Sequence, residues 1–375
     1  METAGRLRFA DVLVSIEDPR QSAKVKHDRV ELLVVAVTAV LVGADTFVEM
    51  ELWAEEKLEW LRGYLRLPHG IPSRDTFGRI FGLIDPQQFE SAFRRWVSGI
   101  LPVLGAEIVA SDGKTSRRSG GIDATAPHMV SAFAAGAGMV LGQRATAEKS
   151  NEITAIPELL STLALTGCTV TIEAMGTQTA IAGAIQERGA DYVLAVKDNQ
   201  PKLAESIQDF WNSFRAPPAC HTPHPSAQSV EKNHGRIEIR RCTVFDRLEC
   251  LDKPQQWKGL RCFAVLESER TVGNKTTHEQ RMYIGSLPPD AERIRQAIRS
   301  HWAVENRLPW VMDVSFNDDQ MRARTKAAAH NLAVLKHITL KLIRLDPVKR
   351  IGSIKTRRII AATSDQYGAE LLGLK

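Results

Sequence analysis

The sequence predicts a mixed α/β fold that is preceded by an all-helical N-terminal region. Up to about residue 103, apolar side chains recur at helical spacing. From residue 104, three strand-like segments precede an alternation of helices and strands, which is typical of a mixed sheet covered by helices. The chain has 375 residues, more than one small core can hold. We therefore expect two domains, at 1–103 and 104–375, the second with a β insertion at about 215–287.

The helical region is predicted from its apolar periodicity and its helix-start signals. Helices are expected at 29–42 and 47–65. Ser73 is a candidate N-cap, and Asp85-Pro86 supplies a cap and a first helical residue before a second apolar stripe. The two short helices after these signals suit either a helix-turn-helix DNA reader or a helical pair packed in a core.

The elements after residue 104 are expected in a defined order. Strands are predicted at 108–111, 128–133, 139–145, 168–172 and 192–196, with helices at 151–163, 177–187 and 201–214. Residues 215–228 are rich in Pro, Ser and His and are expected to form a loop. Strands at 236–245, 260–267 and 277–284 then form the β insertion, and Asp290 caps a final helix.

Composition predicts a cytoplasmic protein without a membrane segment. Five cysteines occur without CxxC spacing, which indicates reduced thiols. The first twenty residues contain no apolar core, so no signal peptide is predicted. The longest apolar run, 32–43, is too short to span a bilayer.

Basic residues concentrate near the C-terminus. The net charge is +5 and the isoelectric point is about 8.9. Between Arg322 and Arg358 there are eleven Lys or Arg residues and one acid, Asp346. Such a run forms either a solvated helix face or a surface for the phosphates of a nucleic acid. We expect nucleic-acid contact.

Three carboxylates occur where chemistry is expected. Asp112 ends an apolar strand-like run, Glu173 follows another, and Glu305 lies on the apolar face of the final helix. A buried salt bridge to Arg299 or Arg307 would explain Glu305 alone. Acids at two strand tips and on one helix together predict a divalent-metal site, because open sheets place chemistry at strand ends.

Mg²⁺ is the expected metal, since it prefers oxygen ligands and is held by a few carboxylates together with water and phosphate. Two such ions, with Mn²⁺ as a substitute, can activate an attacking oxygen and stabilise the leaving oxygen of a phosphodiester. No histidine base is then required.

Eight ordered blocks carry a resemblance to a known family. They are "GIPSRDTFGRIFGLIDP", "SDGKTSRRS", "EKSNEITAIPELL", "VTIEAMGTQ", "DYVLAVKDNQ", "NHGRIEIRRC", "HWAVENRLPWVMDVSF" and "NLAVLKHITL". Together they resemble the H-repeat-associated bacterial insertion-sequence transposases, a DDE group with an RNase H-like catalytic core. The resemblance covers nearly the whole chain. It implies a DNA transposase that performs metal-dependent strand cleavage and strand transfer at transposon ends.

The resemblance also implies roles and partners. Asp112 is the expected first catalytic and metal-binding acid, Glu173 the second and Glu305 the third. The expected partners are transposon-end and target DNA in the bacterial nucleoid, and the joining of two ends suggests a homodimer. The helical N-terminal region resembles the associated domain of the family.

The chain departs from the family at its second acid. The family has Asp where this chain has Glu173, and near-octahedral Mg²⁺ tolerates displaced ligands poorly, so impaired activity is expected. Pro309 stands where the family usually has His, and Ser116 and Arg118 replace Leu and Gly. A catalytically inactive, DNA-binding transposase relic is the alternative, and a nuclease outside transposition is a third interpretation.

Several polar residues are predicted to contact DNA. They are Lys114, Arg117, Lys197, Asn199, His234, Arg236 and His301. Each lies beside a strand tip, at the start of the β insertion or on the helix face of Glu305, where phosphate contacts are expected. Each also has a structural interpretation as a loop charge, a turn residue or a core-edge histidine. Cys220, His221 and His224 lack a clear fourth ligand for zinc.

Overall fold

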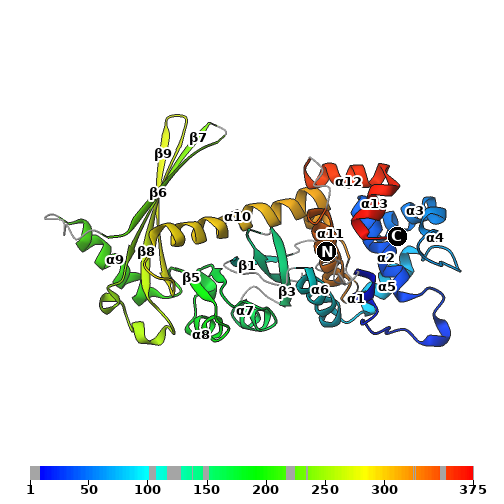
Figure 1. Ribbon diagram of the computed structural model, residues 1–375, viewed down its shortest axis with the longest axis horizontal. Helices are drawn as coiled ribbons and strands as arrows, with labels where there is room; N and C mark the ends of the chain where they lie inside the picture. The colour runs from blue at the N-terminus through cyan, green and yellow to red at the C-terminus, as the bar shows by residue number, and fades with distance from the viewer. Residues whose placement is uncertain are drawn as a thin grey trace, which may run out of the picture.

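The computed structural model describes residues 9–100, 107–115, 128–136, 138–146, 152–216, 224–233, 235–323, 325, 327–346 and 352–374. Within these ranges, the side chains of 9, 10, 24, 98–100, 114, 115, 145, 233 and 303–309 are not described. The molecule is elongated. A sheet lies at one end, a helical body at the other, and the long helix α10 (Ala291–Phe316) runs between them (Figure 1).

Nine strands of the described chain form one mixed sheet in the order β3-β2-β1-β4-β5-β9-β8-β7-β6. The core strands are β1 (Ile108–Thr115), β2 (His128–Ala134), β3 (Met139–Thr146), β4 (Thr169–Ile172) and β5 (Asp191–Val196). β4 pairs in parallel with β1 and with β5, whereas β2 pairs antiparallel with both of its neighbours. The predicted mixed α/β class is confirmed.

Strand β1 is longer than predicted because its two neighbours end at different places. Its parallel pairing with β4 ends at Ser111 and Ile172. Its antiparallel pairing with β2 continues to Thr115 and His128. The prediction that Asp112 follows the strand is therefore wrong, since Asp112 lies inside β1, at the point where the β4 partner stops.

The β insertion extends the same sheet. It contains β6 (Ser226–Asn233), β7 (Arg236–Phe245), β8 (Cys262–Val272) and β9 (Lys275–Gly285). β9 pairs antiparallel with β5, which joins the insertion to the core strands. β6 begins inside the predicted loop 215–228, so that prediction is wrong for its last residues. β6 lies at the edge of the sheet, where a mostly polar strand is common. Its backbone pairs with β7.

Helices cover both faces of the sheet, as predicted. α7 (Glu152–Ser161) contacts β2 and β3, and α8 (Thr179–Glu187) contacts β5. α9 (Pro201–Arg215) packs Phe210 against Phe245 of β7, with ring centres 4.9 Å apart. α10 contacts β1, β4 and β7 and contributes Ile294 and Ile298 to a second, separate apolar core.

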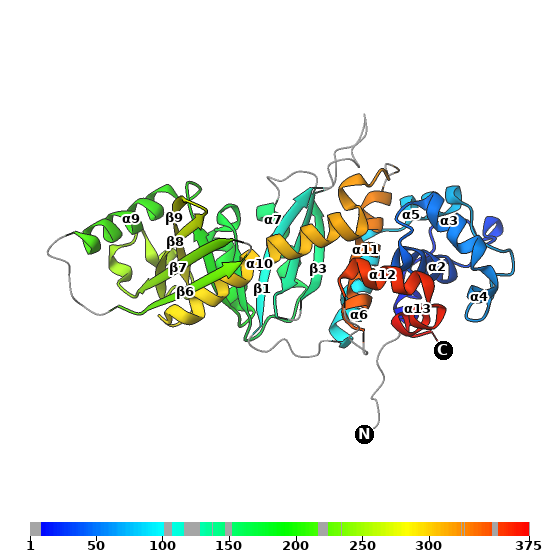
Figure 2. The ribbon, with the colours of Figure 1, turned by 90° about the horizontal axis from the view of Figure 1, so that it is seen from above.

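The helical body combines both ends of the chain (Figure 2). The N-terminal helices are α1 (Phe9–Leu13), α2 (Arg29–Val42), α3 (Phe47–Glu56), α4 (Leu58–Arg62), α5 (Arg74–Leu83) and α6 (Pro86–Ile100). The C-terminal helices α11 (Ala328–Arg344), α12 (Ile354–Thr363) and α13 (Asp365–Leu372) pack with them, chiefly through α2, α5 and α6. The domain boundary at residue 103 stays a prediction.

The predicted helix-start signals are confirmed. The Ser73 hydroxyl accepts a hydrogen bond from the Thr76 amide at 3.3 Å, and α6 begins at Pro86. The apolar stripes of α5 and α6, which include Phe77 and Phe93, are buried. This burial fits the interpretation of α5 and α6 as a packed helical pair.

The basic C-terminal run is partly buried, so some of its cations are removed from any nucleic-acid surface, while nucleic-acid contact by the rest of the run stays a prediction. Lys336 and Lys341 on α11 are 1% and 2% exposed, and Arg358 on α12 is 5% exposed. Lys336 Nζ lies 3.4 Å from Asp318, and Arg358 lies 2.6 Å from Asp45. These cations face the helical core, where DNA phosphates do not reach.

Among the described residues, no single helix is both long and apolar enough to cross a membrane. Helices α2 and α3 meet the length and composition required only as a pair, and they are bent by 95° relative to each other. Leu33 and Val37 of α2 are fully buried in the protein core.

Candidate active site

Asp112 and Glu173 lie side by side where two parallel strands stop pairing. The last paired residues of β1 and β4 are Ser111 and Ile172; Asp112 is the next residue of β1, and Glu173 is the residue that follows β4. Neighbouring strands lie about 4.8 Å apart, so the register brings these acids together. Asp112 is half-buried and Glu173 is exposed.

The charges around Asp112 favour a cation. The pKa of Asp112 is raised to about 6, first because the side chain is buried and then because the Glu173 carboxylate is close. Glu152 raises the pKa further, while the Gly113 amide and His128 lower it. A carboxyl group that is crowded by other carboxylates is typical of functional sites.

Helix α10 crosses β1 and β4 and carries the third predicted acid. Asp290 caps this helix, as predicted, because its carboxylate accepts hydrogen bonds from the amides of Glu292 and Arg293 at 3.0 and 3.1 Å. α10 continues through Pro309 to Phe316. The Glu305 side chain lies outside the described residues, so its place in the site stays a prediction.

His301 joins α10 to β4 one helical turn before Glu305. Its Nδ1 atom lies 3.0 Å from Oγ1 of Thr171, and the two residues are 7% and 2% exposed. Burial lowers the pKa of His301, so the imidazole is neutral near pH 7. The observed contact is internal to the protein, and contact of His301 with DNA stays a prediction.

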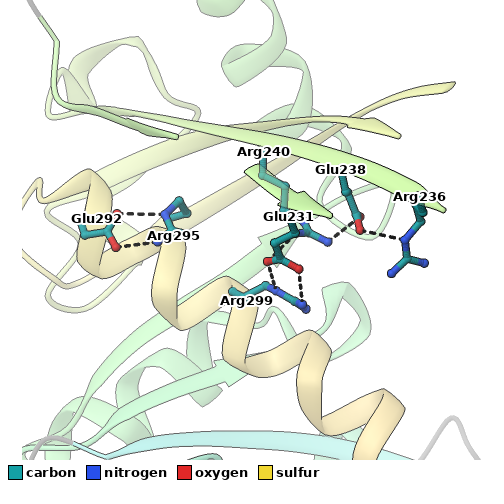
Figure 3. Close-up of polar contacts among 7 residues, drawn as sticks. All are labelled: Glu231, Arg236, Glu238, Arg240, Glu292, Arg295 and Arg299. Carbon is teal, nitrogen blue, oxygen red and sulfur yellow. Dashed lines mark hydrogen bonds and ion pairs between the residues drawn. The ribbon is translucent and has the colours of Figure 1, made fainter. Parts of the chain in front are cut away.

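Ion pairs join α10 to the β insertion (Figure 3). Arg299 donates to both carboxylate oxygens of Glu231, at 2.9 and 2.8 Å. Arg240 of β7 donates to the same carboxylate at 3.0 Å. Arg299 therefore has a carboxylate partner other than Glu305, which the salt-bridge interpretation of Glu305 did not foresee.

Two of the residues predicted to contact DNA lie near Glu173. Lys197 is exposed and lines the same cavity as Glu173. Asn199 instead binds the backbone, because its side-chain amide donates to the carbonyl groups of Ala174 and Thr177. It therefore holds the loop that follows Glu173.

Of the remaining predicted DNA contacts, Arg236 is described and does not join the residues around Glu173. Arg236 lies at the end of β7 that is remote from β5, with its Nε atom 3.6 Å from Glu238 (Figure 3). The Lys114 side chain, Arg117 and His234 lie outside the described residues. DNA contact by all these residues stays a prediction.

A cavity of about 310 Å³ lies beside Glu173. Its lining comes from β4, β5, β9 and α10 and includes Lys197, Arg281, His301 and Trp302. The Arg281 guanidinium carbon lies 3.6 Å from the centre of the Trp302 ring, a cation–π contact. Nothing local in the sequence distinguishes Arg281 from the other charged residues of β9.

His128 and Glu152 form a further pair close to Asp112. His128 Nε2, at the start of β2, lies 2.6 Å from Glu152 Oε1, at the start of α7. The two side chains are 3% and 13% exposed. The residues are 24 positions apart in the chain. The only sequence signal was that Glu152 falls within a block of the family resemblance.

The two described acids, Asp112 and Glu173, are suitable ligands for a divalent metal. Asp112 and Glu173 offer the oxygen ligands that Mg²⁺ prefers, and a cation would relieve their mutual repulsion. No group of three His, Cys, Asp or Glu side chains in the described part of the chain could hold a metal ion. The Glu305 side chain does not belong to that part.

The zinc interpretation of the Pro-rich loop gains no support. The His224 ring packs on Phe214 and Phe245, with ring centres 5.1 and 4.8 Å apart. Cys220 and His221 lie outside the described residues.

The chain matches two family models. Residues 10–97 match the model described as "DDE_Tnp_1-associated", and residues 90–342 match "Transposase DDE domain". The two matches together extend from α1 to α11.

Similar proteins match over nearly their whole length. "Putative transposase YncI" of Escherichia coli O157:H7 is 40% identical over 368 residues, which is 96% of this chain and 93% of the relative. "H repeat-associated putative transposase YhhI" of Escherichia coli K12 is 36% identical over 372 residues, 96% of each chain. A cryo-EM structure of the piggyBac transposase synaptic complex with hairpin DNA has a TM-score of 0.45 and 10% identity, covering 98% of this chain and 80% of the other.

Proposed function

The chain belongs to the DDE transposase family, in its H-repeat-associated group, and from this premise we propose that it cleaves and joins DNA at the ends of an insertion sequence. The observation that carries the proposal is the register of β1 and β4, because it puts Asp112 and Glu173 side by side. Adjacent carboxylates at the edge of a mixed sheet suit metal-dependent phosphodiester chemistry. The strand order supports an RNase H-like core.

Asp112 and Glu173 are the proposed metal ligands, with Glu305 as the third. Bound Mg²⁺, or Mn²⁺ in its place, would stabilise charge on the attacking and leaving oxygens. The protein contributes position, because sheet register sets the two strand acids and the His301–Thr171 bond holds α10 against β4. An error of about 1 Å in such a geometry can lower the rate about a hundredfold.

The second ligand is the weak member of the proposed site. Glu173 keeps the charge of the family's Asp, but its carboxylate is one methylene farther from β4. We infer a slow enzyme from this displacement. An inactive relic that still binds DNA is the alternative outcome.

Transposon-end and target DNA are the proposed partners. Lys197 and Arg281 line the cavity beside Glu173, and these cations support the proposal that DNA phosphates bind there. Phosphate contacts of this kind position DNA without reading its sequence. Two ends must be joined, which supports a homodimer, and the activity implies a location at the bacterial nucleoid.

Cleavage of labelled DNA that carries the inverted repeats flanking the gene tests this function. Asp112→Asn should lower Mg²⁺-dependent cleavage by more than about a hundredfold while binding, measured by fluorescence anisotropy, stays unchanged. Asp209→Asn, an exposed position on α9, is the matched control and should change neither quantity. Persistent cleavage by Asp112→Asn, or a parallel loss of binding, would refute the assignment.

A further inference from the structure

The side chains of His128 and Glu152 fill the space that a side chain at Gly113 would occupy. A Cβ atom built on Gly113 would lie 2.5 Å from His128 Nε2 and 2.5 Å from Glu152 Oε1. Heavy atoms in ordinary contact are about 3.5–4.0 Å apart. The pair therefore packs directly on the Cα atom of Gly113, and any larger residue there would displace it.

Among the described strands, the section of β1 beyond Ser111 has a neighbour on one side only. Beyond Ser111 its pairing with β4 ends, and β2 alone continues to Thr115. Hydrogen bonds from one neighbour restrain a strand less than bonds from two. A buried contact from a third element, α7, supplies restraint where the β4 partner is missing.

The pair and the Asp112 carboxylate lie on opposite faces of β1. Successive side chains of a strand point to opposite faces, so position 113 faces the side of α7, from which Glu152 comes. Asp112 faces the other side, where α10 packs on β1. Besides its electrostatic effect on Asp112, the pair thus supports the backbone of β1 from behind the proposed metal site.

We propose that His128 and Glu152 are positioning residues. They hold the end of β1 that pairs with β2 but no longer with β4, and so set the distance of Asp112 from Glu173. The 2.6 Å bond between two largely buried side chains makes the pair a fixed support, because neither group can move without breaking it. Gly113 is also required, because it has no side chain to keep the pair away from the backbone of β1. This inference rests on the proposed function, since it requires Asp112 to be a metal ligand.

A double-mutant cycle isolates the contact. Gly113→Ala is made in the wild-type protein and in a His128→Ala/Glu152→Ala background. Gly183→Ala on α8 is the matched control, because a Cβ there meets nothing within 4 Å. Two quantities are measured on the full chain: the melting temperature without metal, and Mn²⁺ affinity by electron paramagnetic resonance.

In the wild-type background, Gly113→Ala should lower the melting temperature by about 3 °C or more. It should also weaken Mn²⁺ binding by about tenfold or more. Both effects should be clearly smaller when the pair is absent, and Gly183→Ala should weaken neither quantity. Equal effects of Gly113→Ala in the two backgrounds would overturn the inference.

The conservative variant Glu152→Gln separates position from charge. It keeps an oxygen that accepts a hydrogen bond from the imidazole, so Mn²⁺ affinity should stay near that of the wild type, whereas Glu152→Ala should weaken it. Equal losses in the two variants would overturn the positioning role. A wild-type protein that binds no Mn²⁺ would instead refute the proposed function, while the metal-free melting temperatures would still report on the contact itself.

Discussion

Nδ1 of His301 and Oγ1 of Thr171 lie 3.0 Å apart and join helix α10 to strand β4. Thr171 precedes Glu173 by two residues, and His301 precedes Glu305 by one helical turn. One buried hydrogen bond therefore connects the two elements that carry the second and third proposed metal ligands. Loss of this bond would change the spacing of the carboxylates before it changed the fold of either element.

Variants of His301 and Thr171 should lower the cleavage rate, and Thr171→Val, which keeps the predicted DNA contact of His301, should do so without weakening DNA binding. His301→Ala and Thr171→Val break the same bond, so each is expected to cost about tenfold to a hundredfold in rate. The double variant should lose little more than the stronger single variant, because the contact is shared. Fully additive losses in single-turnover cleavage would show that the two side chains act independently.

The buried His301 also predicts a pH dependence of stability. Burial holds the pKa of His301 below its usual value of about 6.5. As the pH falls below that value, the unfolded chain binds a proton that the folded chain does not, so the free energy of unfolding decreases. Between about pH 7 and pH 5, the melting temperature should fall less for His301→Gln than for the wild type. Identical falls would contradict this assignment.

The ion pairs of Glu231 should stabilise the contact between α10 and the β insertion. Glu231→Gln leaves Arg299 with a neutral partner, whereas Arg240 keeps its ion pair with Glu238, and we expect a loss of about 1 kcal/mol in urea unfolding, since the pair is partly exposed. Glu59→Gln is the control, because the Glu59–Arg62 pair on α4 is more exposed. Equal losses in the two variants would contradict the special role of Glu231.

Lys341 should destabilise the protein near neutral pH. It is 2% exposed, and burial lowers its pKa to about 7. Its Nζ atom has no hydrogen-bond partner within the described residues and lies 5.5 Å from the centre of the Trp96 ring. The unfolded lysine stays protonated to about pH 10, so the free energy of unfolding should rise between about pH 7 and pH 10.

Lys341→Met removes this group at similar volume. The variant should be more stable than the wild type near pH 7, by about 1–3 kcal/mol, and should lose the rise toward higher pH. Urea unfolding at the two pH values measures both effects. A destabilised methionine variant at pH 7 would show that the ammonium group has a stabilising partner.

Local sequence patterns predicted helices and strands correctly where the first and last residues are set by neighbours in the sequence. Helix α2 and strand β7 begin and end where expected, and Ser73 and Asp290 cap their helices. Strand β6 escaped prediction because its polar sequence resembles a loop, and only its pairing with β7 makes it a strand. The added length of β1 depends in the same way on a partner strand, β2, elsewhere in the chain.

The sequence alone pointed to the two strand acids of the candidate site. It did not reveal the side-chain contacts that hold the elements carrying them. Asp112 and Glu173 follow apolar runs that the sequence displays directly. The bond between Thr171 and His301 joins residues 130 positions apart, and no local pattern reveals it. The burial of Lys336 also depends on packing between distant helices, so its charge alone did not reveal that it lies in the helical core.

We propose that Asp112 and Glu173 form one metal-binding pair, in which the Glu173 side chain is longer than the site requires. The most direct test is the rate of Mg²⁺-dependent cleavage of DNA carrying the flanking inverted repeats, measured for the wild type, Glu173→Asp and Glu173→Asp/Asp112→Asn. Glu173→Asp should raise the rate, by up to about a hundredfold, and the double variant should be inactive. An inert Glu173→Asp protein, or cleavage by the double variant, would contradict the claim.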